Sequence, residues 1–220
     1  MGDTIEFSCP NGSTANGYRA CAAGNGIVLL QEWWGVNEQM KAVARRCAQA
    51  GFDTLVPDLY HGRVTQDPDE AGHMMDGLDW VGATEQEVCG AVNLLSRRCA
   101  RIAVMGYCMG GALSIIAGVL LPKVDAVICY YGVPPLEQAD PGKLQVPFQG
   151  HFANRDDWCT PQAVDLLEQS LANVGSDVEL HRYEAAHGFF NDSEADVYDR
   201  DASELSWQRV SDFLAHHLST

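Results

Sequence analysis

Short apolar segments alternate with longer amphipathic segments along most of this chain. Each apolar segment has the length and continuity expected of a strand buried on both faces, and the segments comprise residues 27–30, 54–56, 102–105 and 126–130. Between them, apolar residues recur at helical spacing, with Met40, Val43, Ala44, Cys47 and Ala48 on one face and Val88, Ala91, Val92 and Leu95 on another. This alternation predicts an α/β fold with a mostly parallel central sheet and helices on both faces.

Capping and turn signals place several element boundaries. Thr84 and Glu87 have the spacing of a capping box, which predicts a helix start. Thr160 followed by Pro161 predicts a second helix start, and Gly51 predicts a helix end. Further expected elements are helices at 109–121 and 205–218, strands at 146–150 and 178–183, and an antiparallel edge hairpin from residues 4–9 and 18–22.

The length of the chain favours one domain over residues 1–220. With 220 residues and 46% hydrophobic content, the chain can form one sizeable core. A polar stretch, residues 60–82, separates the strand at 54–56 from the next helix. This stretch fits two interpretations equally well, a partial lid with a short helix near residues 69–76 or an ordinary surface connection.

The charge balance excludes several classes of partner. The chain has 14 basic and 30 acidic residues, and its net charge of -16 disfavours nucleic acid and anionic membrane surfaces. No apolar run approaches the roughly 18 residues of a membrane helix, and the first residues lack the pattern of a signal peptide. We therefore expect a cytoplasmic protein, a monomer or weak homodimer, whose partner is a small molecule.

The eight cysteines do not form a metal or disulfide pattern. They lie at positions 9, 21, 47, 89, 99, 108, 129 and 159, with no C-x-x-C pair. Several fall within apolar periodic segments, so most are expected to be small buried hydrophobic residues. We expect no metal site and no cofactor.

One cysteine stands in a turn that suits a nucleophile. Residues 106–111, with the sequence Gly-Tyr-Cys-Met-Gly-Gly, directly follow the predicted strand at 102–105. Small residues two positions before and after Cys108 reproduce the G-x-S-x-G elbow, with sulfur in place of the serine oxygen. A helix beginning at Met109 would favour the thiolate of Cys108.

A thiol nucleophile requires a base and an acid that orients the base. His187 is the best candidate base because it follows the predicted strand at 178–183, and six other histidines have less suitable positions. For the acid, Asp157 is preferred over its neighbour Asp156 in the loop after the predicted strand at 146–150. The resulting chain order of nucleophile, acid and histidine is that of α/β-hydrolases.

Backbone amides and one further carboxylate complete the predicted site. The amide of Met109 is a candidate oxyanion donor because it follows the nucleophile, and the amide of Trp33 is the candidate second donor from another strand end. Glu32 ends an apolar strand, where burial of an unpaired carboxylate is costly. Glu32 is therefore either solvated or held near Cys108 for a chemical reason.

These motifs give the chain a resemblance to the dienelactone hydrolase family of α/β-hydrolases. The resemblance covers nearly the whole chain and is carried by the cysteine elbow, residues 31–37 (Gln-Glu-Trp-Trp-Gly-Val-Asn), residues 57–60 (Pro-Asp-Leu-Tyr) and residues 187–189 (His-Gly-Phe). It implies a carboxylic ester hydrolase with a triad of Cys108, His187 and Asp157. It also implies that Glu32 interacts with the cysteine and helps to form the thiolate when substrate binds.

The chain departs from the family where a substrate carboxylate would be bound. Family enzymes that open dienelactone use two arginines, one in the connection matching residues 67–80 and one shortly after the histidine. Here residues 67–80 contain no Lys or Arg, and the residue four places after His187 is Asn191. Arg63, Arg155 or His73 could substitute. Otherwise the substrate is a neutral or less acidic ester, lactone or thioester.

Aromatic residues supply the expected substrate contacts. The candidates are Trp33, Trp34, Tyr107, Trp158, Phe189 and Phe190, although each also suits an ordinary core position. The predicted function is hydrolysis of a lactone, carboxylic ester or thioester through an acyl-cysteine intermediate. Two alternatives remain at this point, a non-catalytic member that binds a small ligand or partner protein, and a redox-sensing thiol protein.

Overall fold

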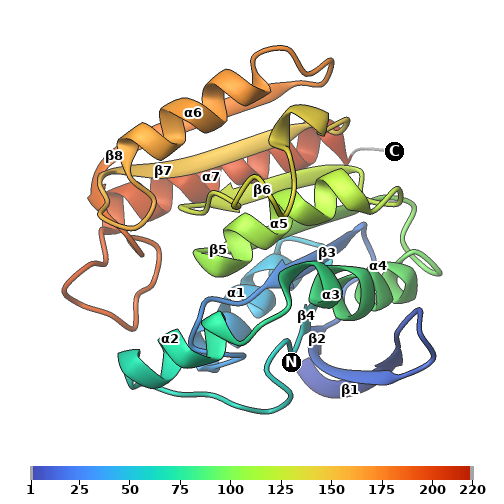
Figure 1. The fold of residues 1–220 in the computed structure, drawn as a ribbon. Helices are drawn as coiled ribbons and strands as arrows, with labels where there is room; N and C mark the ends of the chain where they lie inside the picture. The colour runs from blue at the N-terminus through green and yellow to red at the C-terminus, as the bar shows by residue number, and fades with distance from the viewer. Residues whose placement is uncertain (1, 219–220) are drawn as a thin grey trace.

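A single eight-stranded sheet runs through the computed structural model, which describes residues 2–218 (Figure 1). The order is β1-β2-β4-β3-β5-β6-β7-β8, in which β3 to β8 are parallel and β2 pairs antiparallel with both of its neighbours. The strands are β1 (Gly2–Ser8), β2 (Thr14–Ala20), β3 (Gly26–Leu30), β4 (Asp53–Pro57), β5 (Ile102–Tyr107), β6 (Ala126–Tyr130), β7 (Phe148–Arg155) and β8 (Val178–Ala186). The predicted α/β architecture is confirmed.

Helices cover both faces of the sheet. One face packs against α1 (Glu38–Gln49) and α7 (Arg200–His217), and the other against α3 (Trp80–Ala83), α4 (Cys89–Leu95), α5 (Met109–Leu120) and α6 (Pro161–Leu171) (Figure 1). A π-helical turn, Thr84–Val88, joins α3 to α4, and a short 3₁₀ turn, Pro141–Lys143, precedes β7. Helix α2 (Pro68–Asp76) confirms the short helix expected between residues 60 and 82.

The strand β3 shows why the apolar segments are continuous. Its side chains alternate between the two cores, with Val28 and Leu30 on one side and Ile27 and Leu29 on the other. All four side chains are fully buried. A strand covered on both faces has no solvent side, so every position favours an apolar residue.

Two predicted helix starts are wrong for physical reasons. The helix expected at Thr84 begins at Trp80 instead, because the Asp79 side chain caps it by accepting from the Gly82 amide. The Thr84 hydroxyl donates to the Trp80 carbonyl, four residues earlier, and therefore does not cap a helix start. The last helix begins at Arg200, ahead of the expected residue 205, because Asp199 accepts from the Ala202 amide.

Other expected elements are present, although β2 begins four residues before the expected residue 18 and β7 extends to Arg155, beyond the expected residue 150. Strands β1 and β2 form the antiparallel edge hairpin, and Thr160 caps α6 by accepting from the Ala163 amide. Gly51 has φ +101° directly after the C-cap of α1, a conformation that favours glycine. Within residues 2–218, none of the helices has the length and apolar character needed to cross a membrane.

Candidate active site

Five loops with polar or reactive side chains meet at one edge of the sheet. Glu32 follows β3, Cys108 follows β5, Tyr131 follows β6, Asp156 follows β7 and His187 follows β8. These strands are parallel, so their carboxyl ends lie together. Open α/β sheets place ligand sites at this edge.

The backbone at Cys108 presents the thiol in a sparsely populated conformation. Cys108 has φ +54° and ψ −117°, and its amide donates to the Tyr130 carbonyl at 3.0 Å. The turn is possible because Gly106 and Gly110 have no Cβ: a Cβ on Gly106 would overlap the Gly110 carbonyl, and one on Gly110 would lie 2.5 Å from the Leu30 oxygen. Such strained backbone costs of order 1–3 kcal/mol and is retained here by the packing around it.

The imidazole of His187 connects the thiol to a carboxylate. Its Nε2 lies 3.1 Å from Cys108 Sγ, and its Nδ1 lies 2.7 Å from Asp156 Oδ2. Burial alone would lower the pKa of His187, but the hydrogen bonds to Asp156 and Cys108 outweigh it and raise that pKa. A raised pKa favours the imidazolium, which is the form that pairs with a thiolate.

The acid that faces His187 is Asp156, so the preference for Asp157 is wrong. Asp156 is buried, and its Oδ1 accepts from the amides of Trp158 and Cys159 at 2.8 and 2.7 Å. These two bonds close a turn that directs Oδ2 toward His187. Asp157 lies on the outside of the same turn and is exposed to solvent.

Glu32 is buried at the site and held by two neutral donors. The Tyr131 hydroxyl donates to Oε1 at 3.1 Å and the Asn191 side chain donates to Oε2 at 2.8 Å. Burial raises the pKa of Glu32 to about 7, although His187 and the two hydrogen bonds oppose the rise. Of the two interpretations of Glu32, the solvated one is wrong.

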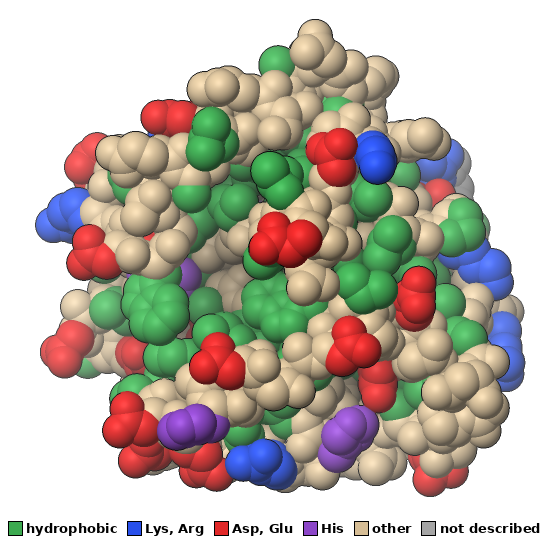
Figure 2. Space-filling view, in the orientation of Figure 1, with side chains coloured by type: hydrophobic (Ala, Val, Ile, Leu, Met, Phe, Trp, Pro, Cys, Tyr) green, Lys and Arg blue, Asp and Glu red, His purple; other side chains and the backbone are tan. Residues whose placement is uncertain are grey.

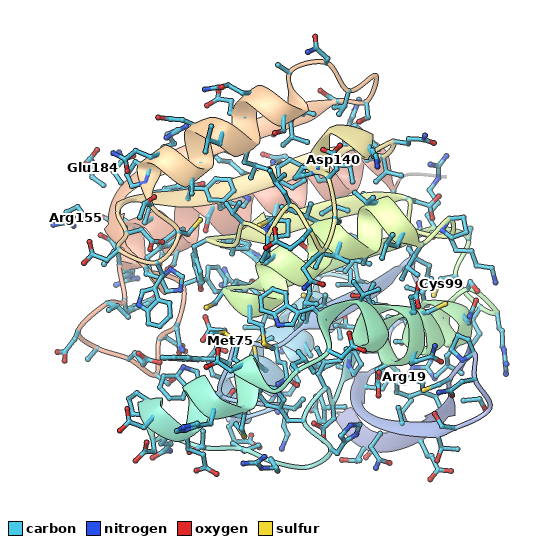
Figure 3. All side chains as sticks on the ribbon, in the orientation of Figure 1. Arg19, Met75, Cys99, Asp140, Arg155 and Glu184 are labelled. Atoms are coloured by element: carbon cyan, nitrogen blue, oxygen red, sulfur yellow. The ribbon has the colours of Figure 1, made fainter. Side chains whose placement is uncertain are left out.

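A cavity of about 200 Å³ opens beside these residues. Its lining comprises Glu32, Trp33, Trp34, Met75, Cys108, Trp158, His187, Gly188, Asn191, Glu194 and Val197. Figure 2 shows hydrophobic side chains gathered around a hollow above α2, and Figure 3 shows Met75 projecting from α2 toward the rest of the molecule. The segment from 60 to 82 therefore contributes a wall of the cavity.

The sequence matches the model of a known protein family. A sequence model described as the dienelactone hydrolase family matches residues 15–218. The chain belongs to the dienelactone hydrolase family. It is 29% identical over 234 residues to "Protein usf" of Aquifex pyrophilus, covering 100% of both chains, and 28% identical over 221 residues to a carboxymethylenebutenolidase of Rhodococcus opacus, covering 90% of this chain and 83% of the relative.

A solved structure supports the fold. The crystal structure of a dienelactone hydrolase-like promiscuous phosphotriesterase from metagenomic libraries is similar with a TM-score of 0.83 and 18% sequence identity, over 99% of both chains. The α/β-hydrolase fold of the family is therefore present over nearly the whole chain. Membership in the dienelactone hydrolase family makes the protein a hydrolase.

Three of the aromatic residues expected to contact substrate belong instead to the hydrophobic core of this protein. Tyr107, Phe189 and Phe190 are at most 5% exposed, and the ring of each packs against that of Tyr130. The three tryptophans, in contrast, line the cavity. An aromatic residue next to a catalytic motif can face either the cavity or the core, and the sequence does not distinguish the two.

None of the proposed substitutes for the two family arginines reaches the cavity. Arg63 pairs with Glu70 at 3.3 Å, and His73 Nδ1 lies 2.7 Å from the Asp69 carbonyl on α2. Arg155 lies at the periphery beside Glu184, and its guanidinium donates a hydrogen bond to the Glu184 carbonyl (Figure 3). Among the described residues, no lysine or arginine lines the cavity.

The sequence does not predict the contacts that Tyr131 and Asn191 make with Glu32. Asn191 is notable in the sequence only because this residue stands where the family has an arginine. Tyr131 directly follows the predicted strand at 126–130, and this position at a strand end was the available signal. Nothing in the sequence indicates that the Asn191 amide contacts Glu32, because the two residues are 159 positions apart.

The amides of Met109 and Trp33 belong to segments that border the thiol. Met109 is the first residue of α5, so its amide is one of the unpaired donors at that helix end. Trp33 follows Glu32, and its side chain lines the cavity with Cys108.

A group of possible metal ligands lies elsewhere. Within the part of the chain that the structure describes, Asp177, His216 and His217 have ligand atoms within 4.8 Å of one another. Asp177 precedes β8 and the histidines end α7, so this group is at the opposite end of β8 from His187.

Proposed function

We propose that the protein is a carboxylic ester hydrolase in which Cys108 forms a covalent acyl intermediate. The observation that carries the proposal is the continuous contact from Cys108 Sγ through His187 to Asp156, with distances of 3.1 and 2.7 Å. Nucleophile, base and orienting acid in this arrangement are typical of acyl-transfer enzymes.

The reaction proceeds in two acyl-transfer steps. Sγ of Cys108 attacks the substrate carbonyl carbon while His187 Nε2 holds the thiol proton, and the same proton is delivered to the leaving oxygen or sulfur as its bond to the carbonyl breaks. Water then gives a proton to His187 and adds to the thioester. The carboxylic acid departs, and the proton returns to sulfur, so no cofactor is consumed.

Asp156 and the backbone amides assist both steps. Asp156 keeps the imidazole oriented with Nε2 toward sulfur and stabilises the imidazolium. The amides of Met109 and Trp33 are our candidates for binding the oxyanion, a contribution worth roughly 10²–10³ in turnover for each donor. Glu32 is a positioning residue beside the thiol, and the family resemblance suggests that it helps to form the thiolate when substrate binds.

The absence of lysine and arginine among the described residues that line the cavity supports one class of substrate. A substrate carboxylate entering this cavity would meet Glu32 and Glu194, with no arginine to neutralise it. We therefore infer a lactone, ester or thioester that carries no carboxylate near its reacting carbonyl. The tryptophans around the cavity suit the apolar part of such a substrate.

The test is pre-steady-state hydrolysis of p-nitrophenyl acetate. The wild-type protein should release a burst of nitrophenol equal to one site per chain, and mass spectrometry should find an acetyl group on Cys108. Cys108→Ala should lose both signals, whereas Cys21→Ala, which removes an exposed thiol, should keep them. Unchanged turnover in Cys108→Ala would show that another group is the nucleophile. The absence of both the burst and the acyl adduct in the wild type would indicate a binding protein instead.

A further inference from the structure

Three indole rings form one side of the cavity. The centroid of the Trp33 ring lies 4.9 Å from that of Trp34 and 5.2 Å from that of Trp158, with interplanar angles of 62° and 70°. These rings meet edge to face, so they present surfaces of different orientation to the same space. Indole faces attract cations through the negative potential of the ring.

The charged residues that line the cavity also favour a positively charged ligand. Glu32 and Glu194 both line it, and the Asn191 side chain donates to both carboxylates, at 2.8 and 3.3 Å. Among the described residues that line the cavity, the only group that can carry a positive charge is His187, which is already paired with Asp156 and Cys108. An anion would therefore be repelled, and a neutral occupant would leave the half-buried Glu194 without a positive partner.

A hollow next to the cavity could hold a cationic group of the substrate. A second hollow of about 420 Å³ adjoins the cavity and shares Trp34 and Glu194 with it, and no lysine or arginine among the described residues lines that hollow. A substrate with its carbonyl at Cys108 can extend one arm across this shared boundary. The end of that arm then lies beside an indole and a carboxylate.

We propose that the preferred substrate is an ester or thioester with one arm that ends in a protonated or quaternary amine, seated between Trp34 and Glu194. This proposal rests on the function proposed above and adds the substrate class. The cation would interact with the ring of Trp34 and with the carboxylate of Glu194, while Trp33 and Trp158 enclose the rest of the arm. A carboxylate at the same point would face Glu194 directly.

Matched substrates test the proposal. One set comprises acetylthiocholine, its uncharged tert-butyl isostere (S-3,3-dimethylbutyl thioacetate) and an analogue with a terminal carboxylate, and a second set carries the same three groups on the acyl side. In at least one set, kcat/KM for the cationic member should exceed that for the uncharged isostere by about 3- to 30-fold, the range expected of a cation over an aromatic ring. The carboxylate should be the poorest substrate.

Variants locate the effect. Glu194→Gln and Trp34→Leu should each bring the ratio of cationic to uncharged kcat/KM toward one, whereas Glu85→Gln, which removes an exposed carboxylate outside both hollows, should leave the ratio unchanged. Tetramethylammonium should also competitively inhibit hydrolysis of p-nitrophenyl acetate by the wild type.

Two failures can be separated. If neither set favours the cation while the nitrophenyl burst is intact, the substrate proposal is overturned and the hydrolase proposal stands. If the burst is absent, the hydrolase proposal fails and the substrate proposal fails with it.

Discussion

At Asp156, one carboxyl group performs two tasks. Oδ1 accepts the amides of Trp158 and Cys159 and so shapes the loop after β7, while Oδ2 contacts His187. The loop and the imidazole are therefore oriented by the same side chain. A change at Asp156 affects both the direction of the imidazole and the charge beside it.

Paired amide substitutions test this role. Asp156→Asn keeps the size of the side chain but removes the negative charge beside His187, and we expect kcat to fall by about 10²–10⁴ because the base loses its orientation and its partner charge. Asp157→Asn should stay close to wild type. Ester hydrolysis measured for both variants checks the assignment, and a larger loss in Asp157→Asn would contradict it.

Glu32 links the site to the pH dependence of stability. Its pKa in the folded protein is about 7, against 4.5 for the ordinary carboxyl group, so between these values the folded protein retains a proton that the unfolded chain releases. The contribution of Glu32 to the free energy of unfolding should therefore fall as pH rises from 4.5 to 7. The change amounts to roughly 3 kcal/mol, since each pKa unit corresponds to about 1.4 kcal/mol.

Denaturant unfolding of the wild type and Glu32→Gln at pH 4.5, 6 and 8 measures this effect. The stability of the wild type relative to Glu32→Gln should decrease as pH rises and then level off, because the variant lacks the titrating group. Glu137→Gln, at an exposed position, is the control and should show no comparable slope. A constant difference between wild type and Glu32→Gln would contradict the prediction.

At the scale of single residues, the sequence indicates which residues belong to the site better than it indicates where their side chains point. Cys108 and His187 could be selected because each stands at a strand end with a recognisable spacing. Asp156 and Asp157 share the same loop, and only the hydrogen bonds of that loop decide which one faces inward. The contact between Asn191 and Glu32 depends on tertiary packing and leaves no local pattern.

At the scale of elements, the elbow is the junction on which the site depends. Strand β5 and helix α5 approach so closely that Gly106 and Gly110 leave no room for a side chain. The backbone of Gly110 also lies against the end of β3, where the Leu30 and Gln31 carbonyls are 2.5 and 2.6 Å from its ideal Cβ position. The thiol is thus placed by three elements together.

Two alanine substitutions should have opposite effects. Gly106→Ala should destabilise the protein by several kcal/mol, because its Cβ would overlap the Gly110 carbonyl, a backbone atom that cannot rotate away. Gly72→Ala, in α2 with nothing within 4 Å of the new Cβ, should stabilise by up to about 1 kcal/mol through helix propensity. Thermal unfolding of both variants checks the signs, and a stable Gly106→Ala would show that the elbow can relax.

The element boundaries show where sequence patterns suffice. The buried strands and the caps at Thr160 and Gly51 are local features, so they could be predicted. Thr84 has a capping sequence, but the helix starts earlier because Asp79 provides a stronger local cap. A motif of four residues does not show that another cap precedes it.

At the scale of the whole molecule, negative charge dominates. The chain has 30 acidic and 14 basic residues, and the face in Figure 2 carries more acidic than basic side chains. Such an excess destabilises a compact state through repulsion between like charges. Each surface ion pair, such as Arg200 with Glu204, offsets only a small part of this.

Added salt should therefore stabilise the protein. Raising NaCl from about 10 mM to about 150 mM shortens the Debye length from ~30 Å to ~8 Å and weakens the repulsion. We expect Tm to rise by a few degrees in differential scanning calorimetry. Sucrose at equal osmolarity is the control for solvent effects, and a fall in Tm with salt would show that attractive pairs dominate instead.

The global arrangement could be predicted only in part. Alternating strands and helices indicate a parallel sheet. The order β2-β4-β3-β5, in which β3 pairs with β5 as well as with β4, is not a local property of the sequence. The site exists because that order brings the ends of β3, β5, β7 and β8 to one edge. The positions of Cys108 and His187 after predicted strands indicated this convergence, because parallel strands end at one edge, whereas the order of the strands could not be read from periodicity.

The concentration of indoles at the cavity has an optical consequence. Three of the five tryptophans line it, so most of the indole rings of the protein lie beside the cavity that contains the Cys108 sulfur. Trp158 is 65% exposed, and a molecule that enters the cavity displaces water from its ring. Its emission then moves to shorter wavelength, so occupancy can be followed by fluorescence in unlabelled protein, even for compounds that are never cleaved.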